Sequence, residues 1–209
     1  MNLDRLAVLA HEVRSPVAAL AAIADAYPTA DDARRRRLLD LAGAAVAGLE
    51  RLLADTAAGS LRLERLDAGL LAVDVAETAA LGGALVVTET EGGLEVDGDP
   101  DRLRQALDNL IANAVGHSPA GGTVTVTARL EGGSVVIAVA DKGEGIASDD
   151  LGRVFEPGVR LTAARPGSGL GLAVVHTIAH AHGGEVEVES SPGQGATFRL
   201  VLPRASGAG

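Results

Sequence analysis

Apolar residues recur along the first part of the chain at alternating spacings of three and four, the pattern of a helix with one buried face. Pro28 interrupts this pattern, and Thr29 or Asp31 supplies a cap for a second helix, which we expect over residues 33–57. A hairpin of this size cannot bury both apolar faces alone. We therefore expect two copies to pair as a dimeric four-helix bundle, with packing of the hairpin on the rest of its own chain as the alternative. The first helix presents a seam made of Leu3, Leu6, Ala10, Val13, Val17, Leu20 and Ala24.

From about residue 61 the pattern changes to a mixture of helices and short strands. Asp99 as a cap and Pro100 at the first helical position mark the start of one helix. Alternating runs joined by Gly-containing turns predict hairpins. The fold class that follows is α+β, with the helical hairpin followed by an α/β two-layer sandwich and a largely antiparallel sheet. We expect helices over 73–81, 99–118 and 169–184, and strands over 84–90, 94–98, 123–130, 134–141, 185–190 and 196–203.

The same change of pattern predicts the domain organisation. Residues 1–59 form the helical hairpin, residues 60–205 form the mixed domain, and residues 206–209 are a tail. The net charge of −10 falls almost entirely on the second part, and this acidity argues against a nucleic-acid partner. The absence of cysteine excludes disulfides and thiolate metal sites. No apolar run is long enough to span a membrane and no signal peptide is evident, so we expect a soluble cytoplasmic protein.

Glycines at the start of the last predicted helix indicate a possible anion site. Gly167, Gly169 and Gly171 leave backbone N–H groups exposed where the helix dipole favours negative charge. The stretch is not a P-loop, because no Gly-Lys-Ser/Thr follows, and it is not a dinucleotide fingerprint. A purely structural Gly-rich helix start is the alternative.

Two further groups of polar residues suit a nucleotide site. Asp141 ends a predicted strand and is followed by Gly143 and Gly145, so its carboxylate can accept a hydrogen bond from an exocyclic amine; an ordinary Asx turn is the alternative. Asn109 and Asn113 are four residues apart and project from one face of a helix. Amide oxygens are suitable ligands for Mg²⁺, although the pair also fits a simple polar face.

Taken together and in this order, four stretches resemble the ATP-binding domain of sensor histidine kinases, whose fold is shared with gyrase-type ATPases. They are "DPDRLRQALDNLIANAVGHS", "DKGEGI", "VFEPG" and "GSGLGLAVV". The resemblance implies ATP and Mg²⁺ as ligands, with Asn113 on the metal and Asp141 on adenine. It also implies a lid over residues 147–166 anchored by Phe155, and further nucleotide contacts from Asn109, Gly143, Gly145, Gly167, Gly169, Leu170 and Gly171.

Asn109 bears on the type of reaction. Hydrolysing relatives resemble this pattern but carry Glu at the corresponding place, as a base for water. An amide cannot act as that base, so the sequence favours phosphoryl transfer to a protein residue.

The acceptor suggested by the resemblance is His11. "HEVRSP" resembles the phospho-acceptor box of the same kinases, and the hairpin resembles their dimerisation and phosphotransfer domain. Glu12 is placed to hydrogen-bond the imidazole and stabilise its developing charge. Pro16 removes a helical hydrogen bond, so we expect a bend there. The implied function is an ATP-dependent protein-histidine kinase, acting as a homodimer and passing the phosphoryl group to an aspartate in a response-regulator receiver domain.

The sequence departs from the family pattern at several positions. Gly116 stands where these kinases commonly carry a cation toward the phosphates, and Arg160, Arg165 or His117 are candidates to compensate. Lys142 replaces an Asn and Gly158 replaces an aromatic residue of the lid.

These departures leave alternatives open. One is a nucleotide-degenerate phosphotransferase or scaffold dimer, and another is a gyrase-like ATPase. Ser15 stands four residues after His11, where Thr or Asn is common in kinases that also dephosphorylate their partner, so a phosphatase activity is a further alternative, for which the sequence offers no support. Ten residues precede His11, so the input comes from a separate sensor protein or the chain is part of a longer one. His176 and His180, four residues apart, are a weak candidate metal pair.

Overall fold

The computed structural model describes residues 3–32, 34, 35, 37–39, 41–43, 45, 46, 61–159 and 169–207. The chain divides into two compact units. One comprises Met1–Gly59 with Glu156–Leu170, and the other comprises Ser60–Phe155 with Gly171–Gly209. None of the helices in the described ranges is long and apolar enough to cross a membrane.

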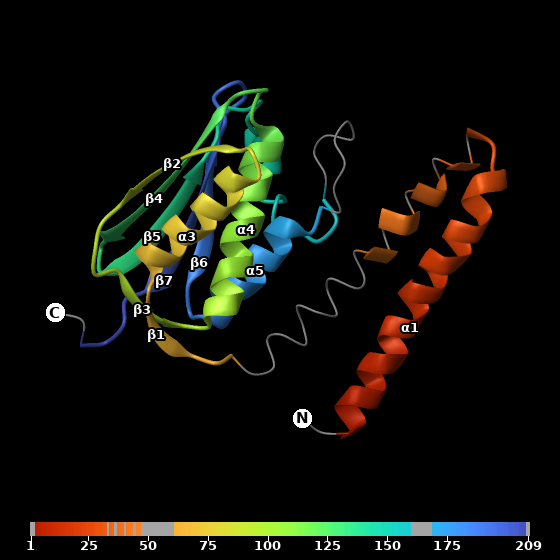
Figure 1. The fold of residues 1–209 in the computed structure, drawn as a ribbon, viewed down its shortest axis with the longest axis horizontal. Helices are drawn as coiled ribbons and strands as arrows, with labels where there is room; N and C mark the ends of the chain where they lie inside the picture. The colour runs from red at the N-terminus through yellow and green to blue at the C-terminus, as the bar shows by residue number, and fades with distance from the viewer. Residues whose placement is uncertain are drawn as a thin grey trace. The chain divides into compact units, whose positions relative to one another are not determined.

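The N-terminal unit is helical where it is described. Helix α1 spans Leu3–Ala26 without interruption at Pro16, and the short 3-10 helix η1 spans Tyr27–Thr29 (Figure 1). Asp31 caps the next helical stretch, because its carboxylate accepts the Arg34 N–H at 2.8 Å. All the described residues from 32 to 46 are helical, which agrees with the predicted second helix as far as 46; residues 47–57 of that prediction lie outside the described residues.

The second unit is built on a five-stranded mixed sheet. Its strand order is β2-β4-β5-β7-β6, in which β2 pairs parallel with β4 and every other pairing is antiparallel. Strands β1 and β3 form a separate two-stranded antiparallel sheet. The strands are β1 Glu64–Asp67, β2 Leu85–Thr90, β3 Glu95–Gly98, β4 Thr123–Glu131, β5 Ser134–Ala140, β6 Glu185–Ser190 and β7 Ala196–Pro203.

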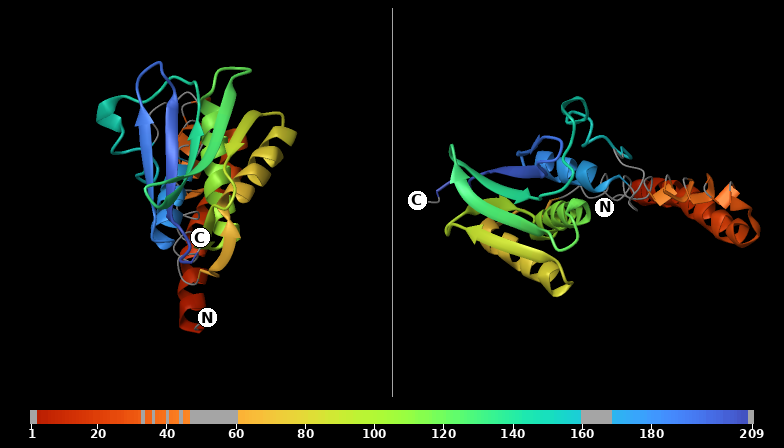
Figure 2. Two further views of the ribbon diagram at one scale, coloured as in Figure 1. Left: turned by 90° about the vertical axis from the view of Figure 1, so that its left-hand side faces the viewer. Right: turned by 90° about the horizontal axis from the view of Figure 1, so that it is seen from above.

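Three helices form the second layer, against one face of the sheet (Figures 1 and 2). Helix α3, Ala68–Leu81, contacts β2 and β4; α4, Pro100–His117, contacts β4 and β5; and α5, Gly171–Ala181, contacts β6 and β7. The 3-10 helix η2 spans Ser148–Asp150. This arrangement confirms the predicted two-layer α/β sandwich.

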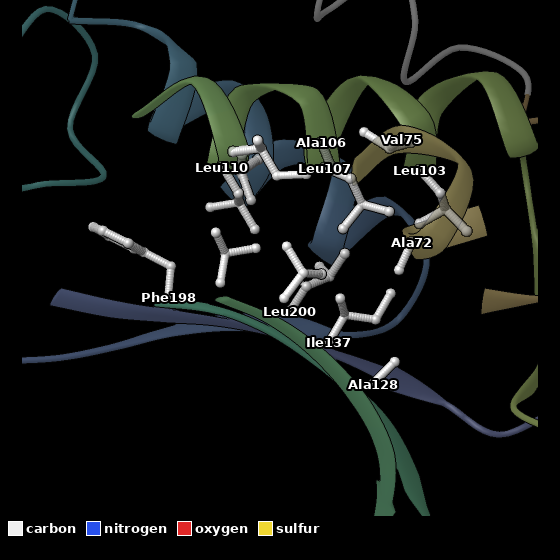
Figure 3. Close-up of a cluster of buried hydrophobic side chains, with 14 of the residues drawn as sticks. Ala72, Val75, Leu103, Ala106, Leu107, Leu110, Ala128, Ile137, Phe198 and Leu200 are labelled. Atoms are coloured by element: carbon white, nitrogen blue, oxygen red, sulfur yellow. The ribbon is translucent and has the colours of Figure 1, made fainter. Parts of the chain in front are cut away.

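The core lies between the two layers. Alternation along β4 and β7 directs every second side chain toward the helices. Figure 3 shows α4 side chains pointing down onto those of the strands. Because almost all of these residues are aliphatic, they interdigitate closely and hold α4 in a fixed position on the sheet. The labelled members of the cluster are Ala72, Val75, Leu103, Ala106, Leu107, Leu110, Ala128, Ile137, Phe198 and Leu200.

The start of α4 is fixed by the signals that the sequence predicted. Asp99 is the cap, its side chain accepting the Arg102 N–H at 3.2 Å, and Pro100 follows at the first helical position. His182, just beyond α5, accepts the Asp99 N–H through Nε2 at 3.0 Å. This hydrogen bond joins the start of α4 to the end of α5.

Three local details differ from the sequence prediction. Helix α3 begins at Ala68 rather than residue 73, because Asp67 caps it by accepting the N–H groups of Gly69 and Leu70. The strand expected over 94–98 does not join the main sheet but pairs with β1, which the sequence analysis missed. Strand β2 is parallel to its neighbour, so the sheet is mixed.

Candidate functional site

Helix α4 carries the two asparagines of the candidate site. Asn109 and Asn113 are both half-buried, while Leu110 and Ala114 beside them are fully buried. Gly171, the first residue of α5, lies against Asn109: a Cβ built on this glycine would be 3.8 Å from Asn109 Oδ1. Within the described ranges neither side-chain amide has a hydrogen-bond partner. Both amides are therefore open to a ligand.

The carboxylate of Asp141 is held by one of its two oxygens. The side chain follows β5 and is only 7% exposed. Oδ1 accepts the N–H of Gly143 at 2.7 Å and that of Ala196 at 3.3 Å, and the Asp141 N–H donates to the Ala196 carbonyl at 2.9 Å. No bond reaches Oδ2 from the described residues. One oxygen orients the group and the other remains an acceptor, which suits recognition of an amine.

The turn after Asp141 requires its two glycines for packing. A Cβ at Gly143 would lie 2.3 Å from the His117 carbonyl oxygen, and a Cβ at Gly145 would lie 2.0 Å from that of Ser191. Gly145 also has a positive φ of 70°. The turn is pressed between the end of α4 and the loop before β7. Contact of these glycines with a nucleotide stays a prediction.

His117, at the end of α4, faces the same turn. Its Nδ1 lies 3.2 Å from Oε1 of Glu144, and both side chains are partly exposed. The role of His117 as a substitute cation toward the phosphates stays a prediction. The contact with Glu144, 27 residues further along the chain, could not be foreseen from the sequence.

A backbone hydrogen bond joins two glycines that precede α5 in the sequence. Gly158 N–H donates to the Gly169 carbonyl at 3.1 Å, and both glycines have positive φ, 80° and 73°. Glycine suits position 158, because a side chain would be strained at such a φ. Leu170 is buried and Gly171 begins the helix. Arg160, Arg165 and Gly167 lie outside the described residues.

Phe155, the expected lid anchor, packs into the sandwich. Its ring lies edge-on to Phe198 of β7, with centroids 6.2 Å apart, and 5.9 Å from the ring of His176 on α5. Its role toward a lid stays a prediction.

Gly116 and Lys142 are the remaining departures, and both are exposed. A Cβ on Gly116 would meet nothing within 4 Å. A longer side chain therefore fits at this position, and packing does not account for the missing cation.

The predicted acceptor lies on α1. His11 and Glu12 both fall within this helix, five and four residues before Pro16. The helical setting that the sequence predicted is confirmed, and the roles of the two side chains stay predictions.

The fold and the site together define an ATP-binding domain of the histidine kinase and gyrase type. The chain belongs to the family of histidine kinase-, DNA gyrase B- and HSP90-like ATPases, whose model matches residues 98–206. Within it the chain is similar to the catalytic core of sensor histidine kinases, as the motifs predicted.

Named relatives extend this similarity beyond the ATP-binding domain. The sensor-like histidine kinase SenX3 of Mycolicibacterium smegmatis is 37% identical over 96% of this chain and 57% of its own length. The ATP-binding domain of PrrB from Mycobacterium tuberculosis is 34% identical with a TM-score of 0.57, covering 69% of this chain and 98% of that domain. Full-length ShkA in complex with AMPPNP is 31% identical with a TM-score of 0.70, covering all of this chain and 47% of ShkA. The chain thus spans a little over half of SenX3.

Proposed function

We propose that this chain is the catalytic core of an ATP-dependent protein-histidine kinase that phosphorylates His11. The observation that carries the proposal is the extent of the similarity to SenX3, which covers 96% of the chain. An ATPase module alone would match only the second unit, whereas this similarity includes α1 and its histidine. ATP use follows from the family and from the AMPPNP-bound relative.

The reaction transfers the γ-phosphoryl group to an imidazole nitrogen of His11. The N–P bond forms while the bond between the γ-phosphorus and the β,γ-bridging oxygen breaks, and ADP leaves. A neutral imidazole has one nitrogen with a free lone pair for this attack. Glu12 hydrogen-bonds the other nitrogen and stabilises the charge that develops there. The phosphoryl group then passes to an aspartate in the receiver domain of a response regulator.

Asp141 is the residue we assign to adenine. Its Oδ2 accepts the exocyclic amine, while Oδ1 keeps its two backbone donors. Because the side chain is buried, a ligand that lacks this donor leaves the acceptor unsatisfied, which costs about 1–3 kcal/mol. Gly143 and Gly145 shape the wall beside it, and the remaining phosphate contacts are assigned to Arg160, Gly167, Gly169, Leu170 and Gly171.

Asn113 is the ligand we assign to Mg²⁺, with Asn109 beside it. Half-buried amides with no side-chain partner in the described ranges fit an ion that takes oxygen ligands and shares them with phosphates and water. Bound there, Mg²⁺ neutralises the charge that develops on the phosphate oxygens. The chain's own contribution is to hold both amides on a rigid, buried helix.

Asn109 also favours transfer over hydrolysis. Its amide has no basic oxygen able to take a proton from water, and it contacts the start of α5. A water molecule placed there is not activated, so the imidazole remains the competing nucleophile.

The hairpin requires a second copy of the chain. We assign α1 and the helix after it to a dimeric four-helix bundle, with the seam residues facing the partner. The Val17 side chain on this seam is 49% exposed in the single chain. Input then reaches the core through residues outside this chain or through a separate sensor, and we place the core in the cytoplasm, where ATP is abundant.

One experiment tests the proposal. The purified chain is incubated with γ-labelled ATP and Mg²⁺, beside His11→Ala, Asn113→Ala and the control His180→Ala, an exposed histidine outside α1. Acid-labile, alkali-stable label on the wild type and the control but on neither other variant supports the kinase. Steady phosphate release that is independent of His11 contradicts it and supports an ATPase.

A second function, a phosphotransferase or scaffold dimer with a degenerate nucleotide site, is favoured by two observations. Gly116 offers no cation, and His117 is engaged by Glu144. In the same assay, this function predicts no label from ATP but transfer to His11 from a phosphorylated receiver domain.

A further inference from the structure

The structure describes the side chains of four histidines, and two of them are engaged with other protein groups. His182 lies 2.7 Å from the Ile178 carbonyl through Nδ1, which must therefore donate, and it accepts the Asp99 N–H through Nε2. His117 lies against Glu144. Neither of these imidazoles has both the freedom and the geometry to bind an added ion.

The other two histidines face each other on α5. His176 and His180 are one helical turn apart, with their Nε2 atoms separated by 3.1 Å and their ring centroids by 4.3 Å. His176 is half-buried and His180 is exposed. Two imidazole ligands of a tetrahedral metal, each about 2.0–2.1 Å from it, have nitrogens about 3.3 Å apart. The observed separation is close to that value.

We propose that His176 and His180 form a chelating site for a divalent transition-metal ion of the Zn²⁺, Ni²⁺ or Cu²⁺ class. Both Nε2 atoms bind the ion and water completes its coordination. Imidazole is a preferred ligand for these metals, whereas Mg²⁺ prefers oxygen, so this site is chemically distinct from the one at Asn113. The described ranges contain no cluster of three or more His, Asp or Glu residues able to hold a metal. The ion is therefore exchangeable rather than structural.

The surroundings hold the His176 ring in place. The Phe155 ring packs against His176 on one side and limits its rotation. A ligand that is already oriented binds a metal at a smaller cost in free energy.

A hydrogen bond between the two rings is the competing explanation of the short distance. In that case one Nε2 carries a proton and donates it to the lone pair of the other. The pair is then a local helix contact, and removing either ring changes nothing in the protein's response to metals.

The test uses the full chain prepared without a polyhistidine tag and titrated calorimetrically with Zn²⁺ and Ni²⁺. We expect one equivalent to bind. Because a single imidazole does not chelate, His180→Gln weakens binding at least about tenfold, and His176→Gln does the same. His117→Gln, which changes a histidine outside the pair, leaves it unchanged.

His180 is exposed, so its variant keeps the fold, which circular dichroism verifies. No binding to the wild type, or equal binding to wild type and His180→Gln, overturns the proposal. As an independent readout, Zn²⁺ shifts the Nε2 resonances of both His176 and His180 in ¹⁵N spectra; shifts confined to His11 or His117 likewise overturn it.

Discussion

The two units of the chain differ most in what they bury. Among the described side chains up to residue 46, Ala30 alone is fully buried, and apolar residues such as Val17 and Leu41 are 49% and 58% exposed. The second unit encloses a continuous core between its sheet and three helices. A sandwich of this kind is stabilised within one chain, whereas the described side chains of the first unit bury little apolar surface within it. This contrast is what the proposed dimer would explain, since a second copy of the chain would cover the exposed seam.

The largest expected effect comes from the core of the second unit. Leu110→Ala leaves a cavity under α4, because Leu110 is completely buried, and it lowers the free energy of unfolding by about 2–5 kcal/mol. Leu81→Ala is the matched control, since Leu81 is 90% exposed, and its effect stays below about 0.5 kcal/mol. Urea denaturation followed by circular dichroism measures both. Equal losses in the two variants contradict the assigned core.

The turn that supports Asp141 ranks next. Gly145→Ala combines a positive φ with a contact of 2.0 Å to the Ser191 carbonyl, so we expect a loss of about 1–3 kcal/mol from backbone strain, and ATP binding to weaken with it. Gly152→Ala, where a Cβ meets nothing within 4 Å, serves as the control. Denaturation and calorimetric ATP titration are the measurements. If Gly145→Ala unfolds at the same urea concentration as the wild type and binds ATP equally well, the prediction is wrong.

The hairpin is tested through its seam. Val17→Asp places a charge where the partner's helix packs, so the dimer dissociates at least about tenfold more readily. The second unit, with its own core, unfolds at an unchanged urea concentration. Ala22→Asp, on the opposite side of α1, leaves the dimer intact. Sedimentation equilibrium measures the dissociation of the dimer in each variant. A wild-type chain that is monomeric at all concentrations would rule out the four-helix bundle.

The smallest effect concerns the missing cation. Gly116→Lys adds an ammonium group at an exposed site with open space, and we expect ATP to bind about three- to tenfold more tightly. Gly116→Gln restores helix propensity without charge and isolates the electrostatic part. Calorimetric titration of both variants gives the comparison. If Gly116→Gln and Gly116→Lys both bind ATP more tightly, the gain comes from helix propensity rather than from the added charge.

Much of the fold was predictable because its signals are local. Asp99 and Pro100 started α4 where expected, and the glycines at 132 and 133, both with positive φ, joined β4 to β5. The parallel pairing of β2 and the small β1–β3 sheet were not predictable in this way. These pairings depend on contacts between distant segments, which periodicity does not encode.

The residues of the candidate site were predictable from the sequence, but the contacts that hold them in place were not. Asp141 and the asparagines stood out by position and type. Nothing in the residue pattern indicated that Ala196 N–H and Gly143 N–H share one oxygen of Asp141, or that Glu144 contacts His117. Such partners are chosen by the packing of the turn against α4 and the loop before β7, and they become evident only in three dimensions.

The bond from Gly158 to Gly169 has a consequence for how the protein can vary. It fixes the two ends of an intervening stretch of chain side by side, whatever that stretch contains. Lengthening a closed loop is inexpensive, since each doubling adds only about 0.6 kcal/mol. We therefore expect an insertion between these glycines to cost little, so a reporter peptide grafted there should leave the urea unfolding of the second unit unchanged.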